Sequence, residues 1–428
     1  MNGRPARRRP PVAAVAALAL ALLAGGCGRW VPEPTPSPTA TPSRTPVAEP
    51  TPTPTPPPLR PEDALERAVW VHLFDDTLKT RDGIRRVVAD LVSADATAII
   101  AEVVRRQDAY YDSDVLARTV DPAVGPGLDV LAVLVQEAHA AGLEVHAWIP
   151  VAPTWHESYV GLPAPDGWLT TEHGLNAPEA DRWVTRTVDG TWDAYLDPGL
   201  PEVRAHVAAV VGEIAARYDV DGVHLDYVRY ASERHGYHPR ALARYQQETG
   251  ATGTPTPDDP AWSDWRREQV TELVRAAADA VEASGSRAML SAAVISWGDG
   301  PGGPTTPSFA DTRAYNEALQ DWEGWAETGL IDVLLPMNYF REAKGDQAAW
   351  LRAWLGYTEQ LTARTGARIV PGIAGYLNSP TDALTQIGLA MASAGAAAMY
   401  SYQGSTSDPA FPLWADLAAT GWGTASGD

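Results

Sequence analysis

Residues 218–230 read Tyr-Asp-Val-Asp-Gly-Val-His-Leu-Asp-Tyr-Val-Arg-Tyr, a stretch typical of a buried strand with polar groups on one face. Successive side chains of a strand point to opposite faces, so His224 and Asp226 share one face while Val223 and Leu225 share the other. The apolar face suits contact with helices, so we expect His224 and Asp226 to point into the interior of a barrel. A carboxylate in that place is costly unless it is paired or used. Asp226 is therefore the first candidate for a functional residue.

The rest of the chain repeats one unit, an apolar strand-like run followed by a helical pattern. Eight such alternations predict an α/β protein with a (β/α)8 TIM barrel, and a doubly wound open sheet is the alternative. The predicted strands are residues 68–74, 97–104, 143–151, 222–230, 288–296, 332–340, 368–376 and 396–403. The predicted helices are residues 82–93, 128–141, 201–218, 262–283, 312–328, 346–365, 381–394 and 412–419.

Two of the expected βα loops are much longer than the others, residues 150–200 after the third strand and residues 230–260 after the fourth. Barrels of this kind carry their chemistry at the carboxyl ends of the strands, on such loops. The enlarged loops therefore predict the walls of a long groove. Asp226 lies near that end of its strand, whereas Asp221 lies at the opposite end and is expected to be structural.

The first 63 residues differ in character from the rest. A basic start that includes Arg7 and Arg8 precedes an apolar run over residues 12–24, which is too short to span a bilayer. The run ends in Gly-Gly-Cys27, which resembles a bacterial lipobox and predicts a signal peptide over residues 1–26 and lipidation of Cys27. A Pro/Thr-rich linker then fills residues 27–63 and should be extended, since proline prevents helix and sheet. We expect an extracytoplasmic barrel over residues 64–424, lipid-anchored to the membrane; secretion with cleavage nearby is the alternative.

Composition limits the function classes further. The formal net charge of −21 disfavours a nucleic-acid partner. The single cysteine excludes a disulfide scaffold and a cysteine-ligated metal site. Sixteen Trp and fifteen Tyr stand against four Phe, and such amphipathic rings suit grooves that bind sugars.

Several separated stretches share a family pattern. Residues 102–111 read Glu-Val-Val-Arg-Arg-Gln-Asp-Ala-Tyr-Tyr, residues 146–148 read His-Ala-Trp, and residues 336–339 read Pro-Met-Asn-Tyr. With the strand at 222–230, they make the chain resemble the glycosyl-hydrolase-like family 10 over about residues 66–405. That resemblance implies a glycosidase-type barrel without a cofactor, which acts on a polysaccharide, including cell-wall glycan. The chain departs from the family's Q-V-R-R-R-G-D-A-Y-Y at Glu102, Val104 and Gln107.

Glycoside hydrolysis normally needs two carboxyl groups, one as acid and one as nucleophile or base. Asp226 is our choice for one of them. Glu102 should face inward together with Val104, where burial would raise its pKa as a general acid requires; the alternative is a structural Glu paired with Arg105 or Arg106. Asp108 follows in the expected loop and is the next candidate. Two further carboxyl groups qualify by position, Glu157 and Glu342.

Substrate-binding residues are expected near the strand ends. Arg105, Arg106 and Arg229 can donate paired hydrogen bonds to carboxylates or to an acidic sugar. Aromatic rings can stack on sugar rings, and amide or phenol groups can bond hydroxyls. The other predicted substrate-binding residues are Tyr111, His146, Trp148, His224, Trp297, Asn338, Tyr339, Tyr376 and Tyr402.

Three other functions are weighed. A barrel that binds carbohydrate without cleaving it is possible because the end of the second strand departs from the family. A chitinase-type mechanism is disfavoured, because its acid position on the fourth strand is occupied by Val228. A metal-dependent hydrolase would use His72, His146 and His224 as zinc ligands. We expect no metal, since the H-x-H and the strand-four Lys of such barrels are missing.

Overall fold

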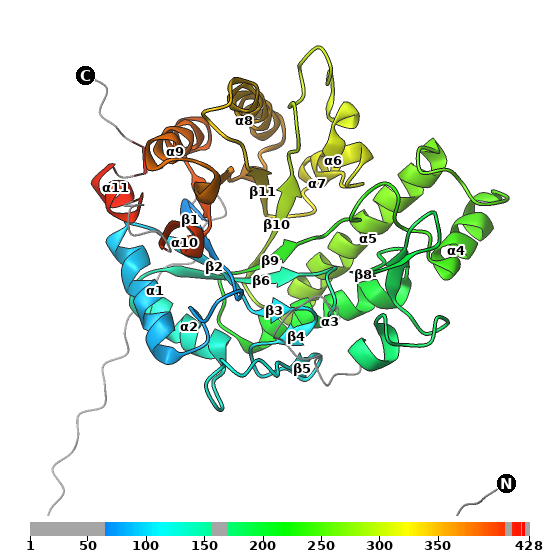
Figure 1. The fold of residues 1–428 in the computed structure, drawn as a ribbon, viewed down its shortest axis with the longest axis horizontal. Helices are drawn as coiled ribbons and strands as arrows, with labels where there is room; N and C mark the ends of the chain where they lie inside the picture. The colour runs from blue at the N-terminus through cyan, green and yellow to red at the C-terminus, as the bar shows by residue number, and fades with distance from the viewer. Residues whose placement is uncertain (1–64, 156–168, 407–412, 421, 424–428) are drawn as a thin grey trace, which may run out of the picture. The chain divides into compact units, whose positions relative to one another are not determined.

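Eight parallel strands, of which one is interrupted, close into a barrel in the computed structural model (Figure 1). Each strand pairs with its two neighbours. The pairing of β14 with β1 and that of β10 with β11 complete the ring. The predicted (β/α)8 barrel is thereby confirmed. In barrel order the strands are β1 (Arg67–Val71), β2 (Ala98–Glu102), β6 (Glu144–Pro150), β9 (Gly222–Asp226), β10 (Met289–Ile295), β11 (Val333–Asn338), β12 (Arg368–Ile369) with β13 (Gly372–Ala374), and β14 (Ala397–Tyr400).

The structure describes residues 65–155, 169–406, 413–420 and 422–423. The predicted signal peptide, the linker with Cys27, and Glu157 therefore lie outside the described residues. Among the helices of the described part, none is long and apolar enough to cross a membrane.

The helices that cover the barrel begin where the sequence supplies caps. The side chain of Thr80 accepts from the Gly83 N–H at the start of the first helix, and Asp129 and Asp259 cap two others in the same way. Proline in the first turn, as at Pro201, costs no hydrogen bond because that N–H has no helical partner. These helices are α1 (Arg81–Ser93), α2 (Val130–Ala140), α3 (Pro201–Arg217), α5 (Pro260–Ser284), α7 (Trp322–Thr328), α8 (Gly345–Thr365), α9 (Pro380–Ala394) and α11 (Leu413–Thr420).

Strand alternation separates the core into two parts. Val223 and Leu225 belong to the large cluster between strands and helices. A smaller cluster fills the barrel interior and includes Trp70, Trp148 and Leu335. The predicted parity of β9 is confirmed, because His224 and Asp226 alternate with the two outward residues and are buried.

Three expected elements differ from the structure. Residues 312–328 do not form one helix, because Leu319 has a left-handed φ of 55° between α6 (Arg313–Asn316) and α7. The buried Gln320 that follows accepts from the N–H of Ile295 at 2.8 Å, so the break joins this segment to the end of β10. The seventh strand of the barrel is split into β12 and β13 around Pro371, because proline has no N–H to donate to the neighbouring strand.

The third difference concerns the end of the second strand. β2 ends at Glu102, and Val104 begins β3 (Val104–Arg105), which pairs with β4 (Asp108–Ala109) in a separate sheet that also holds β5 (Ala117–Arg118). Val104 packs in the outer cluster. Our prediction that it faces inward with Glu102 is therefore wrong, since the chain leaves the barrel between them.

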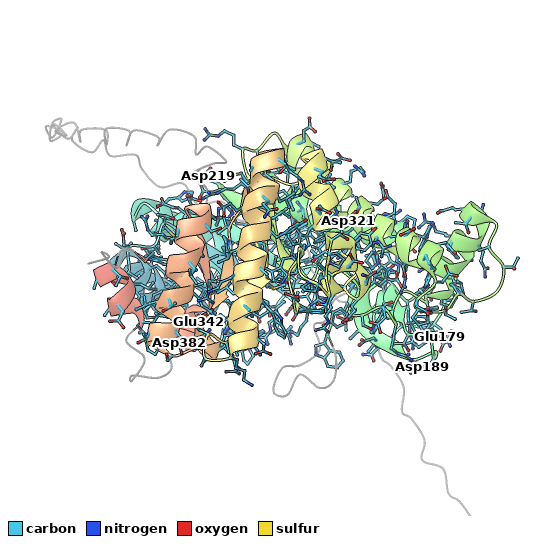
Figure 2. All side chains as sticks on the ribbon, turned by 90° about the horizontal axis from the view of Figure 1, so that it is seen from above. Glu179, Asp189, Asp219, Asp321, Glu342 and Asp382 are labelled. Carbon is cyan, nitrogen blue, oxygen red and sulfur yellow. The ribbon has the colours of Figure 1, made fainter. Side chains whose placement is uncertain are left out.

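The long loops carry structure of their own. β7 (Val184–Arg186) and β8 (Trp192–Leu196) form a hairpin within residues 150–200, and α4 (Pro239–Thr249) lies within residues 230–260. Figure 2 shows the two ends of the barrel, with Asp219, three residues before β9, at one end and Glu342, after β11, at the other. We call the carboxyl end of the strands the mouth and the opposite end the base.

Candidate active site

A cavity of about 430 Å³ opens at the mouth of the barrel. Two acidic side chains line it, Glu102 at the end of β2 and Asp226 at the end of β9. Each is the last residue of its strand, the position where barrels of this kind place catalytic groups. Neither carboxylate forms a salt bridge with any residue in the described part of the chain. Two buried acids without ion partners on one cavity make this the candidate functional site.

Three donors hold or face the Asp226 carboxylate. The Trp148 indole N–H donates to Oδ2 at 3.2 Å, and the Tyr227 backbone N–H donates to Oδ1 at 2.6 Å. Tyr227 has a left-handed φ of 52°, and this conformation accompanies its hydrogen bond back to the preceding side chain. Burial raises the pKa of Asp226, while Arg229 and these two donors oppose the rise. The donors suit an ionised carboxylate.

Glu102 is also buried, and it has fewer hydrogen-bond donors than Asp226. Its Oε2 accepts from the Leu73 backbone N–H at 2.6 Å. Burial raises its pKa to about 7; the Leu73 bond and Arg105 oppose the rise, and the charges of Asp226 and Asp108 add to it. At neutral pH a group of this kind is present in both protonation states, which suits a general acid.

Trp148 lies between the two carboxylates. In the sheet, Glu102 is paired with Trp148 of β6, and Asp226 is paired with Pro150 of the same strand. The two acids therefore stand one strand apart on the same wall, with the Trp148 ring between their strands. That ring bonds Asp226 directly, so it fixes the direction of one carboxylate.

The floor of the cavity rests on a buried histidine. The Trp70 indole N–H donates to His224 Nε2 at 3.2 Å, and His224 Nδ1 lies 2.9 Å from Ser291 Oγ. Because Nε2 accepts, Nδ1 carries the proton and donates to Ser291. Burial, assisted by His146, holds the pKa of His224 well below its usual value. His224 was predicted to bind substrate, but it lies beneath Trp70, which lines the cavity in its place.

Cationic and aromatic side chains form the rim. The Arg229 guanidinium lies over the rings of Tyr227 and Trp297, at 4.8 and 5.4 Å from their centres. Arg105 lies 4.4 Å over the ring of Phe74, which is 59% exposed. The predicted substrate-binding residues that line the cavity are Arg105, Arg106, Trp148, Arg229, Trp297, Tyr339 and Tyr376.

Asp108 is placed differently from our expectation. It belongs to β4 and not to an open loop, is fully buried, and pairs with Arg106 at 3.0 Å. Burial raises its pKa, and Arg106 opposes the rise. Asp108 is not among the residues that line the cavity, so the structure supports a role in holding Arg106.

Other predicted residues also lie away from the cavity. Tyr111 packs against Tyr218 in the outer cluster, and His146 lies inside the barrel nearer the base, 3.2 Å from Glu144. Tyr402 begins α10 (Tyr402–Thr406), since β14 ends two residues earlier. Its hydroxyl donates to Asp90 at 2.6 Å.

Asn338 and Glu342 complete this group. Asn338 is buried at the end of β11, on the face opposite Leu335 and Met337, and does not line the cavity. Glu342 pairs with Arg352 at 2.6 Å, which lowers its pKa. Glu342 is therefore held at the outer helices, where Figure 2 labels it.

The sequence analysis missed several lining residues. Trp70 and Tyr400 come from the first and last strands, and Tyr195 and Tyr227 come from the segments after β6 and β9. The parity of β1 could have identified Trp70, because Ala68 and Trp70 point inward together. No pattern pointed to Tyr195, since its loop folds back over the mouth.

Gln107 explains one departure from the family pattern. It has a φ of 68°, a conformation that favours the Gly of the family. Its side-chain amide donates to the carbonyls of Val151 at 3.0 Å and Pro153 at 3.2 Å. Pro153 lines the cavity, so the Gln side chain fastens a piece of the wall.

The three histidines suggested as zinc ligands have separate surroundings. His146 bonds Glu144, His224 bonds Trp70 and Ser291, and the ring of His72 packs on Phe74. Within the described ranges no group of three or more His, Cys, Asp or Glu side chains has the arrangement to hold a metal ion.

Comparison with known proteins identifies the family of this chain. Residues 66–381 match the family described as glycosyl hydrolase-like 10. The chain belongs to this family. It is 26% identical over 254 residues to glycosyl hydrolase DigH of Escherichia coli (strain K12), covering 59% of this chain and 55% of that protein. It is 26% identical over 262 residues to glycosyl hydrolase YngK of Bacillus subtilis (strain 168), covering 60% and 48%. The chain thus spans about half the length of these curated relatives.

Solved structures agree with the fold. The glycoside hydrolase domain of PgaB (BpsB) from Bordetella bronchiseptica matches with a TM-score of 0.53 and 15% identity, covering 85% of this chain and 100% of that one. The catalytic domain of β-amylase from Paenibacillus polymyxa matches with a TM-score of 0.60 and 11% identity, covering 83% and 97%. At these identities the likeness shows the fold alone.

Proposed function

We propose that this family member is a glycoside hydrolase in which Glu102 and Asp226 are the catalytic carboxyl groups. One observation carries the proposal: two buried acids without ion partners in the described chain end the two strands that flank β6, and both line one cavity. Glycoside hydrolysis requires two carboxyl groups at one site.

The surroundings of the two groups support different roles. Glu102, with a pKa raised to about 7 by burial, is the general acid that protonates the leaving oxygen. Asp226 receives N–H donors from Trp148 and Tyr227 and faces Arg229, so it acts ionised, as the nucleophile or as the base that activates water. The substrate is a polysaccharide, and aromatic rings with two arginines at the rim suit a glycan chain.

The finer substrate and the location are also proposals. The relatives are named glycosyl hydrolases. We propose that residues 1–26 direct export and that Cys27 carries the lipid anchor, and a cell-wall glycan is a substrate that fits this location. Fractionation of cells that express the full chain checks the anchor. The wild type is expected in the membrane fraction, and the Cys27→Ala variant outside it; equal distribution of the two would contradict lipidation.

The activity is tested by incubating the full chain with a panel of glycans that includes peptidoglycan and both acidic and neutral polysaccharides. Product anomers followed by NMR would show cleavage and its stereochemistry. The Asp226→Asn variant should lose at least about 10³-fold in kcat while it keeps glycan binding. A wild type that binds a glycan without cleaving any member of the panel would favour the alternative, a carbohydrate-binding barrel.

A further inference from the structure

Tyr400 is the last residue of β14 and lines the same cavity as the two acids. Ala398 and Tyr400 point into the barrel, whereas Ala397 and Met399 pack in the outer cluster. Tyr402 has the same parity, and it would take this place if the strand reached residue 403 as the sequence predicts. Since β14 ends at Tyr400, the aromatic side chain that reaches the mouth is this one.

The ring of Tyr400 is held on several sides. Its centre lies 6.1 Å from that of Trp70, 6.2 Å from Trp148, 5.3 Å from Tyr339 and 6.0 Å from Tyr376. Two of these neighbours are themselves fixed, since Trp70 donates to His224 and Trp148 donates to Asp226. A ring packed in this way cannot turn freely, so its hydroxyl has a defined position.

The hydroxyl of Tyr400 has no hydrogen-bond partner among the described residues. Two buried tyrosines elsewhere in the chain use theirs, Tyr110 with Asp121 and Tyr230 with Asp197, both at 3.0 Å. The buried hydroxyls of Tyr111 and Tyr237 have no partner among the described residues, but neither residue lines the cavity. A partly buried phenol usually finds a partner. An unused donor on the wall of a cavity is therefore available to a ligand.

Two other phenols on the wall, those of Tyr339 and Tyr376, are also unbonded within the described chain, but the surroundings of Tyr400 are different. Burial raises the pKa of Tyr400, and both Asp226 and Glu102 raise it further. Asp226 is among the charges that raise the pKa of Tyr339, and burial raises the pKa of Tyr376 without a contribution from either acid. Tyr400 thus lines the cavity with both acids and feels the charge of both, and its phenol stays protonated and able to donate.

We propose that Tyr400 is a catalytic residue of this site, whose hydroxyl donates a hydrogen bond to an oxygen atom of the sugar that is held between Glu102 and Asp226. This proposal rests on the proposed function. Hydrogen bonds to sugar hydroxyls that strengthen as the glycosidic bond breaks lower the barrier. The phenol neither gains nor loses a proton in the step, so the two carboxyl groups keep the proton transfers.

Tyr400→Phe tests the proposal, because it removes one oxygen atom and leaves the ring packing intact. On a glycan that the wild type cleaves, kcat should fall about 10- to 100-fold while KM changes less than about threefold. The loss should be the same across the pH range, since the phenol does not titrate there. Tyr357→Phe is the matched control; its hydroxyl bonds Glu323 at 2.5 Å in the outer layer, so its kcat should equal that of the wild type.

The outcomes separate this proposal from the proposed function. If the wild type cleaves the glycan and Tyr400→Phe matches it in kcat, the role of Tyr400 is overturned and the hydrolase stands. A change confined to KM overturns it as well, because the bond would then form equally before and during cleavage. If the wild type binds without cleaving, the proposed function fails and this role fails with it. Unchanged near-ultraviolet circular dichroism of the variant checks that the ring cluster is preserved.

Discussion

The mouth and the base of the barrel treat acidic side chains in opposite ways. Asp221 directly precedes the short strand β9, and Asp226 is its last residue. At the base, burial acts to raise the pKa of Asp221, but hydrogen bonds from His139 at 2.9 Å and the Val145 N–H at 2.7 Å outweigh it and the pKa is lowered. At the mouth, burial prevails and the pKa of Asp226 is raised.

The base therefore gains stability from its charges, while the mouth keeps charges that destabilise the fold. Glu144 at the base also has partners, since it accepts from the Leu65 N–H at 3.2 Å and lies 3.2 Å from His146. Glu102 repeats the opposite pattern at the mouth, where it has a single backbone donor. Buried acids that have no ion partner and lie next to a cavity are candidates for a functional site.

The largest expected effect is that of Glu102→Gln at the mouth. As general acid, Glu102 must be protonated, so wild-type kcat/KM should fall as pH rises above about 7, the pKa to which burial raises this group. Gln cannot donate a proton, and the variant should lose about 10²- to 10⁴-fold in kcat/KM together with this alkaline decline. A pH series of kcat/KM measures both changes.

Glu342→Gln is the control for this experiment. Glu342 was a sequence candidate for the second carboxyl, but it pairs with Arg352 outside the cavity. The variant should keep the wild-type alkaline decline. If the decline disappeared in Glu342→Gln and persisted in Glu102→Gln, the assignment of the acid would be reversed.

A second effect concerns Asp108, a paired acid on the same side as the mouth. Asp108→Asn removes one partner of a buried ion pair, so the free energy of unfolding should fall by about 3 kcal/mol. Below the melting temperature, kcat should change less than about tenfold, because the cavity acids remain. Urea unfolding and kcat measure the two effects. A large loss of kcat at unchanged stability would return Asp108 to the role of acid.

The smallest effect is expected at the base. Asp221→Asn should lower the free energy of unfolding by about 1 kcal/mol, a modest value because both partners are partly exposed. The lowered pKa of Asp221 gives stability above its ordinary value of 3.8 that is lost as pH falls through the lowered pKa. The raised pKa of His139 gives stability below its ordinary 6.5 that is lost as pH rises through the raised value.

The difference between wild type and Asp221→Asn should therefore be greatest between about pH 4 and 6.5, and should shrink at higher pH. Asp219→Asn is the matched control, since Asp219 is exposed two residues away and acts on His139 through its charge, without the hydrogen bond that Asp221 makes. Equal effects of the two substitutions in urea unfolding would show that net charge, and not the pair with His139, stabilises the base.

Much of the fold was predictable because its signals are local. Each predicted strand from 68–74 to 396–403 overlaps an observed barrel strand, and alternation alone oriented His224 and Asp226. The ends of the elements were less predictable. The helix expected over 312–328 is broken by Leu319, and the reason is a tertiary one, the reach of Gln320 to the backbone of β10.

The site was predictable in part for the same reason. Glu102 and Asp226 follow from strand parity and position, whereas Tyr402 was an error of two residues that depended on where β14 ends. Asp108 was misplaced because a two-residue strand has no sequence pattern of its own. Trp70 and Tyr400 belong to the first and last strands, and only closure of the ring brings them together.

By itself, the sequence determined the eight-fold repeat of strand and helix and the inward direction of an acid at the end of the fourth strand, since both depend on the short periods of strand and helix. The tertiary structure decided which inward groups share one cavity, and which acids receive partners. That division has a physical reason. Parity is a property of neighbouring residues, but desolvation and charge pairing depend on atoms that closure of the barrel brings together from strands far apart in the chain.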